Sequence, residues 1–417
     1  MKLTFSKEFP YQFLFALCII LPYFNVYEVT FLVWLTTLFL SIKKKYSIIV
    51  LKYVFSFSAI IIIAFIVGLN KDYPLFIKIR DFTYLVKPIL GILIGYQLCR
   101  NHNCKPFQTI IVTGLIIAIV HLIIVFSSVL LYNVRNIHQL RHYGGFFSDY
   151  EVYALVIVLF YKKFELQLSR KEFFTVAIII GLSSFLYLSR TNFIQFAILI
   201  LAMKGYFVLN KKSLTVIGAF LIAVIIGYSY IYSMNLSRNG TGMEALLYKI
   251  KNAPIEAFKT KVDKDDWQDF NDNYRSYENI ITVRQVKSEG ITGILFGKGM
   301  GSTIKLGKKV WTNDGTYITK AAILHNTYFT IFLKSGLVGV FFCFYFIYLL
   351  LKQNKTDIEL VKNINLLLIG TGVFLVLANW VLLGLYLKLD NKSILLGFIL
   401  AYKELILKEE KALNKHE

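Results

Sequence analysis

Long apolar runs separated by short polar connections dominate the chain, and this pattern predicts a bundle of membrane-spanning helices. A helix needs about 20 apolar residues to cross a bilayer. By that measure the runs predict about twelve spans, the first two short enough to form a re-entrant pair. The expected spans are Tyr11–Asn25, Glu28–Ile42, Ile48–Leu69, Phe82–Leu98, Phe107–Tyr132, Tyr150–Phe164, Phe173–Leu188, Thr191–Leu209, Leu214–Tyr232, Ser335–Leu351, Asn365–Leu387 and Lys392–Leu407.

One polar segment, residues 233–322, is far longer than the other connections. Loops of this length in compact proteins are usually functional. We therefore expect an all-α polytopic membrane protein with about nine helices in residues 1–232, one large loop in residues 233–322 and about three helices in residues 323–417. Within the loop, short helices are expected around Met243–Phe258 and Tyr277–Glu289.

The formal net charge is +21, and the distribution of this charge along the chain decides what it indicates. In a soluble protein so basic a composition would suggest nucleic acid as partner, but 56% of the residues are hydrophobic and most lysines lie between the apolar runs. The lipid bilayer, and no nucleic acid, is therefore the expected partner.

Lysine and arginine also predict the orientation, because they favour the cytoplasmic side of a membrane. The lysine-rich connections alternate with poorer ones, and both chain ends belong to the rich set. Both termini should accordingly be cytoplasmic, and the large loop should face the outer side of the membrane. The rich set includes Lys43, Lys162, Lys163, Lys211, Lys352 and Lys403.

His325 is the main candidate for chemistry, because it stands where the polar loop runs back into an apolar segment. An unperturbed histidine accepts a proton near neutral pH. The run Tyr328 to Leu333 reads as a short helix directly after it. Position alone favours a histidine that only caps this helix.

Three arginines on the expected outer side are candidates for binding an anion. Arg190 lies in a tight turn between two apolar runs, Arg284 lies in the large loop, and Arg141 precedes a glycine pair. A guanidinium group matches phosphate oxygens in pairs and keeps its charge. Converging on one face, they would suit a phosphate or pyrophosphate ligand.

Other chemistry is less well supported. Gly297, Gly299 and Gly301 lack the strand–turn–helix context of a nucleotide site and more plausibly allow tight turns. No histidine, cysteine or carboxylate pattern has metal-ligand spacing, so neither a metal nor a cofactor is expected. The spans also carry almost no acidic residues at mid-depth, which argues against an ion-coupled transporter.

The combination of motifs resembles the O-antigen ligase and O-antigen polymerase family of bacterial membrane glycosyltransferases. His325-Asn326, nine residues and Gly336-Leu-Val-Gly339 are similar to the family's His-Asn and Gly-x-x-Gly signature. The segment from Leu295 to Gly301 after Arg284 resembles its loop motif, and Arg190 resembles its arginine turn. The similarity covers roughly residues 183–340.

The resemblance implies an inverting, metal-independent glycosyltransferase whose donor is a glycan linked to undecaprenyl pyrophosphate. It implies that His325 activates the acceptor hydroxyl, that Arg190 and Arg284 hold the pyrophosphate, and that Arg141, Asn326, Gly297 and Gly299 contribute to substrate binding. It also allows a flippase and a chain-length regulator as partners.

The leading interpretation is a polymerase of O-antigen, capsular or exopolysaccharide repeat units. Two alternatives stay open. A ligase that transfers the glycan to lipid A-core shares the same motifs. A secondary transporter or lipid-linked sugar flippase would need a charged cavity in the membrane or two related halves, and neither is evident in the sequence.

Overall fold

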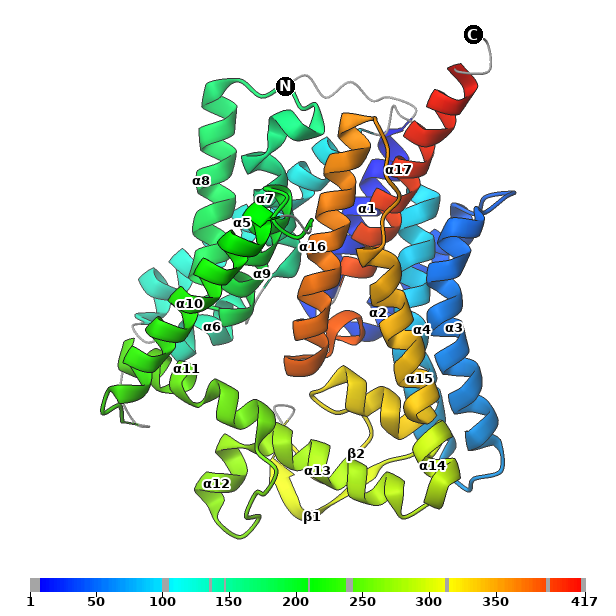
Figure 1. Cartoon of the computed structure of the whole chain (residues 1–417), viewed down its shortest axis with the longest axis vertical. Helices are drawn as coiled ribbons and strands as arrows, with labels where there is room; N and C mark the ends of the chain where they lie inside the picture. Colours follow the sequence, from blue (N-terminus) through cyan, green and yellow to red (C-terminus); the bar gives the residue numbers. More distant parts are fainter. Residues whose placement is uncertain are drawn as a thin grey trace.

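The computed structural model describes residues 8–99, 105–134, 137–145, 148–208, 211–237, 243–311, 315–387 and 391–413. It is largely helical (Figure 1), as the hydrophobic pattern predicts. One two-stranded sheet, absent from the all-α prediction, interrupts the helices.

The helices fall into three groups along the chain. The N-terminal group consists of α1 (Phe9–Ile20), η1 (Leu21–Phe24), α2 (Tyr27–Leu40), α3 (Ile48–Leu69), α4 (Leu75–Leu98), α5 (Pro106–Tyr132), α6 (Ile137–Gly144), α7 (Asp149–Leu159), η3 (Tyr161–Phe164), α8 (Arg170–Leu186), α9 (Arg190–Met203) and α10 (Lys211–Ser233). The polar segment holds α11 (Met243–Phe258), α12 (Trp267–Asp272), α13 (Tyr274–Lys287), α14 (Gly290–Phe296), β1 (Ile304–Trp311) and β2 (Tyr317–Ala321). The C-terminal group is α15 (Thr327–Leu351), α16 (Glu359–Val381), η4 (Gly384–Tyr386) and α17 (Lys392–Leu413).

Five described helices are long and apolar enough to cross a membrane by length and composition. Three further apolar segments, Phe9–Phe24, Tyr27–Leu40 and Arg190–Met203, are shorter. The total of about twelve spans stays a prediction, as does the side on which each end lies. The five long helices cover Ile48–Leu69, Pro106–Tyr132, Ser213–Ser233, Thr327–Leu351 and Glu359–Val381.

The polar segment forms a layer across one end of the helix bundle (Figure 1). Its strands β1 and β2 pair antiparallel, with Ile304 opposite Ala321 and an irregular register between Lys305 and Val310. A small core of its own, including Phe270, Val286 and Leu306, holds the layer together. We call this layer the cap.

Helix α15 changes direction inside its length, and the break sets the geometry of the site. Gly336 has φ +64° and ψ −162°, which divides α15 into a short segment from Thr327 to Ser335 and a long one that continues to Leu351. An L-residue with a side chain is strained at such a φ, so glycine is required here. The expected short helix from Tyr328 to Leu333 is the first of these segments.

The glycine loop after α14 fits into this break. Lys298 N–H donates to Leu333 O at 2.8 Å, and Gly299 N–H donates to Lys334 O at 3.1 Å. On its other side, Met300 N–H donates to Ala64 O of α3 at 2.6 Å. The loop therefore donates hydrogen bonds to carbonyl groups that the break in α15 leaves without helical partners, and it connects the break to α3.

Charged pairs lie buried inside the bundle, which the sequence pattern did not anticipate. Lys334 of α15 contacts Asp81 of α4 at 2.5 Å, and both side chains are fully buried. Lys392 and Asp149 form a second pair, with side chains 2% and 7% exposed. Helix α4 begins at Leu75, before the span expected from Phe82, so Asp81 lies inside the helix. Each of these lysines is held on its carboxylate, so neither pair provides an open charged cavity.

We predict that Gly336→Ala destabilises the protein. An added Cβ would lie 2.3 Å from Leu295 C, at a φ that already disfavours alanine. The combined cost should be about 2–4 kcal/mol, seen as a midpoint of thermal unfolding several degrees lower in detergent. Gly227→Ala in α10 is the matched control, because nothing lies within 4 Å of its Cβ. Equal unfolding midpoints for the two variants would contradict the conclusion that position 336 requires glycine.

Candidate functional site

His325 is fixed in place by the residue that follows it. Asn326 is the N-cap of α15, and its Oδ1 accepts from Tyr328 N–H at 2.9 Å and from Phe329 N–H at 3.3 Å. Asparagine is among the best N-caps because its oxygen satisfies backbone donors that lack partners in the first turn. The backbone of His325 is thereby positioned just before the helix.

A buried carboxylate orients the His325 ring. Glu278 Oε2 accepts from the backbone N–H of His325 at 3.0 Å and contacts its Nδ1 at 2.9 Å. The Glu278 side chain is 2% exposed, whereas that of His325 is 52% exposed. A carboxylate can only accept, so this contact favours the tautomer with the proton on Nδ1, which leaves Nε2 available as an acceptor. This His–carboxylate arrangement is one that general bases use.

Tyr274 completes the surroundings of the pair. It lies one turn before Glu278 on α13, and its ring meets the imidazole edge to face with centroids 5.7 Å apart. Burial raises the pKa of the Tyr274 hydroxyl, and its hydrogen bond to Glu278 and that carboxylate's charge raise the pKa further. The hydroxyl therefore stays protonated and can donate to Glu278.

The same face of α13 carries an arginine. Arg275 lies three residues before Glu278, a spacing that places both on one side of a helix. Arg275 Nη1 contacts Glu256 Oε1 of α11 at 3.0 Å, with both side chains about three-quarters buried. A guanidinium group thus lies one helical turn from the His325–Glu278 pair.

Arg190 reaches this region from the helix bundle. It is the first residue of α9, and its guanidinium lies within electrostatic range of Glu256 and Arg275. Leu188, two residues earlier, has φ +48°. A branched residue in the left-handed region is strained, and such strain persists only where the surrounding structure requires it. The turn before Arg190 therefore holds its backbone in a strained conformation.

Arg141 lies beside Arg190. Arg141 belongs to the short helix α6, outside the long apolar spans. Burial lowers the pKa of its guanidinium, and the positive charge of Arg190 lowers the pKa further. The structure therefore gathers three guanidinium groups, of Arg141, Arg190 and Arg275, around one region. Glu256, which contacts Arg275, offsets one of the three positive charges, and the remaining positive charge suits an anionic ligand.

A buried polar network lies next to the turn that carries Arg190. The Tyr187 hydroxyl donates to Glu151 Oε1 at 3.0 Å, and the Tyr187 ring stacks on His121 with centroids 3.7 Å apart. His121 Nδ1 contacts Ser183 Oγ at 2.8 Å. Tyr187 directly precedes the strained turn at Leu188, so this network anchors the turn that presents Arg190.

Arg284 does not join this cluster. It is exposed on α13, six residues after Glu278, which places it about 120° away around the helix. Its charge acts on Tyr277, whose hydroxyl donates to Leu306 O of β1. Arg284 therefore lies on the side that faces the sheet, and its role in binding pyrophosphate stays a prediction.

Sequence reasoning missed Tyr274 and Arg275 because the helix expected at Tyr277–Glu289 begins at Tyr274, so its first residues were read as loop. Glu278 lay inside the expected helix, but nothing near it in the sequence shows that it meets His325. Had the helix been started at Tyr274, the i, i+3 and i+4 spacing of these residues would have put them on one face.

Asn326 and the two loop glycines have clear packing roles. Asn326 caps α15 and is 1% exposed. A Cβ on Gly297 would lie 2.6 Å from Ser335 N, and one on Gly299 would lie 2.4 Å from Gly68 N. These close approaches explain why the motifs need asparagine and glycine without a ligand, and their contact with substrate stays a prediction.

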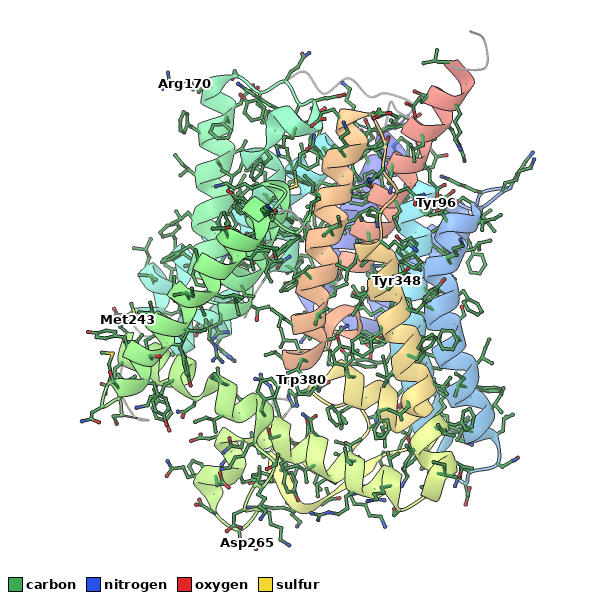
Figure 2. All side chains as sticks on the ribbon, viewed as in Figure 1. Tyr96, Arg170, Met243, Asp265, Tyr348 and Trp380 are labelled. Atoms are coloured by element: carbon green, nitrogen blue, oxygen red, sulfur yellow. The ribbon has the colours of Figure 1, made fainter. Side chains whose placement is uncertain are left out.

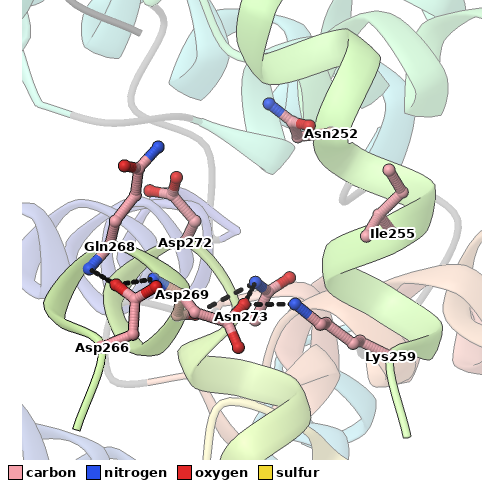
Figure 3. A pocket seen from close by; sticks show the side chains of 8 residues that line it. All are labelled: Asn252, Ile255, Lys259, Asp266, Gln268, Asp269, Asp272 and Asn273. Carbon is pink, nitrogen blue, oxygen red and sulfur yellow. Dashed lines mark hydrogen bonds and ion pairs between the residues drawn. The ribbon is translucent and has the colours of Figure 1, made fainter. Parts of the chain in front are cut away.

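A polar pocket of about 330 Å³ opens between α11 and α12 (Figure 3), and its lining residue Asn273 directly precedes Tyr274. Asn252 and Ile255 line it from α11, and Gln268 and Asp272 line it from α12. Asp269 is held at its base by an ion pair with Lys259 and accepts from Asn273 Nδ2 at 2.8 Å. Amide and carboxylate groups of this kind suit hydroxyl-rich ligands.

Aromatic contacts seat the cap on the bundle close to His325. Trp380, at the end of α16, stacks on Phe258 of α11 with ring centroids 5.5 Å apart. It also meets Phe329 of α15 edge to face at 5.9 Å. Figure 2 shows Trp380 where α16 meets the cap. These contacts hold α11, which carries Glu256, against the bundle that carries Arg190.

No group of three or more histidine, cysteine or acidic residues in the described part of the chain could hold a metal ion. Within that part, the site offers a base and guanidinium groups and no set of metal ligands.

Comparison of the chain with protein-family models, with curated proteins and with solved structures finds no match.

Proposed function

We propose that this protein is an inverting glycosyltransferase of a bacterial inner membrane that polymerises oligosaccharide repeat units carried on undecaprenyl pyrophosphate. The observation that supports it is the orientation of His325 by buried Glu278, one helical turn from Arg275. The resemblance of the sequence motifs to O-antigen polymerases and ligases supplies the substrate class.

In this proposal the arginines bind the donor. The pyrophosphate of the lipid-linked glycan lies against Arg190 and Arg275, with Arg141 behind Arg190. Each guanidinium offers paired donors to phosphate oxygens. As the bond between the sugar C1 and the phosphate oxygen breaks, the charge that develops on pyrophosphate is stabilised by groups already in place.

His325 acts on the acceptor. Its Nε2 takes the proton of an acceptor hydroxyl as that oxygen attacks C1 from the face opposite the leaving group. The imidazolium that forms is stabilised by Glu278, which already accepts from Nδ1. Attack from the opposite face inverts the anomeric configuration. Asn273, which lines the pocket beside α12, directly precedes Tyr274, and in this proposal the pocket holds sugar units of the acceptor chain.

The acceptor is a second lipid-linked glycan, which makes the enzyme a polymerase. In the proposed orientation both termini are cytoplasmic and the cap is periplasmic. That orientation places the site on the side where lipid-linked glycans are exposed after a flippase has moved them.

We predict that Glu278→Gln lowers turnover by about 100-fold or more, because the amide no longer enforces a proton on Nδ1. The measurement is conversion of lipid-linked repeat units by purified protein in liposomes. Glu289→Gln is the control, since Glu289 forms only partly exposed ion pairs with Lys71 and Lys298. His325→Ala should lose at least as much. Adding Glu278→Gln to His325→Ala should cost nothing further, and a further loss would show that Glu278 does not act through His325.

We predict that Arg275→Ala and Arg190→Ala each lower kcat/KM for the lipid-linked donor by about 10–100-fold, because each removes a charge-assisted pair of hydrogen bonds. Arg275→Lys should recover little, since an ammonium cannot form the paired geometry. Arg284→Ala on the other side of α13 should stay within about threefold of the wild type. A larger loss in Arg284→Ala than in Arg275→Ala would place the donor on the sheet side.

The acceptor is tested in cells. We predict that a strain lacking this protein carries single repeat units on its final glycan acceptor, and that the intact gene restores long chains whereas His325→Ala does not. Long chains accumulating on the lipid carrier instead would show that the missing step is transfer to lipid A-core, as in a ligase.

A further inference from the structure

A second pocket, of about 380 Å³, lies at the opposite end of the bundle from His325. It is formed where α3 begins, where α15 ends and along one face of α17. Tyr348, which lines it, is labelled in Figure 2 on the part of α15 that lies away from the cap. We call this cavity the lysine pocket.

The depth of the lysine pocket places it at the second membrane surface. Helix α3 runs from Ile48, beside the pocket, to Leu69, beside the glycine loop, and its 22 residues at 1.5 Å per residue span about 33 Å. That length matches the apolar core of a bilayer together with part of the headgroup layer. If His325 lies at one membrane surface, the lysine pocket lies at the headgroup level of the other.

The pocket is strongly basic. Four lysines line it, Lys52, Lys352, Lys355 and Lys403. Its one acidic residue, Glu404, is buried and already engaged: one carboxylate oxygen accepts from Ser47 Oγ and the other from Tyr96 Oη at 2.9 Å. Glu404 is thus turned toward α3 and α4, and the charge presented to a ligand is that of the lysines.

Lysines at helix ends commonly extend to the water interface without binding anything. Lys403 differs, because its Nζ is held inside the pocket by Gln353 Oε1 at 2.6 Å. Gln353 is itself fixed, since its Nε2 donates to Leu349 O and Leu350 O at 2.9 Å each. The ammonium is therefore positioned in the cavity before any ligand arrives.

One flank of the pocket is apolar. Ile49 and Tyr348 line it and are 47% and 46% exposed. A tyrosine at this depth is typical of the membrane interface, where the ring contacts lipid and the hydroxyl reaches water. A ligand with a charged head and a hydrocarbon tail would fit the lysines and this flank together.

We propose that the lysine pocket binds the phosphate of an anionic phospholipid headgroup, with the acyl chains along Ile49 and Tyr348. Basic pockets between membrane helices are a recognised way of holding anionic lipids. Tyr53 Oη donates to Leu349 O at 3.0 Å and joins α3 to the end of α15 at the pocket wall. A lipid seated there would bridge α3, α15 and α17 and stabilise their packing.

The test uses the full-length protein purified in a zwitterionic detergent, with short-chain phosphatidylglycerol, short-chain phosphatidylcholine and inorganic phosphate as probes. Binding is measured by native mass spectrometry and by the shift in the thermal unfolding midpoint. Lys352→Gln/Lys403→Gln is the test variant. Lys44→Gln/Lys45→Gln is the control, because both lysines are exposed at the same end but do not line the pocket.

We expect phosphatidylglycerol to bind and to raise the unfolding midpoint, and phosphatidylcholine to do neither. The test variant should bind phosphatidylglycerol about 30-fold more weakly, and the control variant should bind like the wild type. Equal binding of both lipids, or equal loss in the two variants, would overturn the proposal. Inorganic phosphate that binds as tightly as the lipid would overturn the assignment to a lipid and indicate a soluble phosphate ligand instead.

Discussion

The buried contact between Lys334 and Asp81 is the constraint on which the geometry of the site rests. The two residues are 253 positions apart, and Asp81 also accepts from Gly301 N–H at 2.8 Å. One carboxylate therefore joins α4, the glycine loop and the break in α15. Removing two charges from water costs about as much as their attraction returns, so such a pair adds little net stability. Removing one partner leaves a buried charge uncompensated, which costs roughly 3–5 kcal/mol. What the pair supplies is position: the short first segment of α15 can lie in only one place.

The functional arrangement follows from that position. The short segment is capped by Asn326, and this cap places His325 against the first turns of α13, where Glu278 is buried. Arg190 belongs to a different part of the bundle and meets the cap through α11, which the Trp380 contacts hold in place. The proposed donor site and base are thus assembled across the seam between cap and bundle. Arg275 and Glu278 both lie on α13 of the cap, whereas Arg190 lies on α9 of the bundle. A shift of the cap would therefore move His325, which Glu278 contacts, relative to Arg190.

The parts of the fold that depend on local pattern were predictable from the sequence. The apolar runs indicated helices, and the bounds expected for the helix at Met243–Phe258 are those of α11. The helical turns of α4 before Phe82 were not expected, because Lys78, Arg80 and Asp81 lower the local hydropathy, although Asp81 is paired with a lysine far along the chain. The sheet was missed because β1 is rich in lysine, and apolar and polar residues alternate only weakly along its sequence. His325 could be found from its motif, but Glu278 could not, because nothing local to either residue shows that they meet.

The two kinds of cation are used at opposite ends of the molecule, and their chemistry explains the division. Arginine occupies the proposed donor site, where planar paired donors can follow a pyrophosphate group through a reaction without losing charge. Lysine occupies the far pocket, where a compact ammonium on a flexible stem suits a headgroup that is held and not transformed. Both sites contact α15 or its flanking residues, His325 before its start and Lys352 after its end. The break at Gly336 separates the segment that positions His325 from the segment that ends at the lysine pocket, so different parts of α15 carry the two sites.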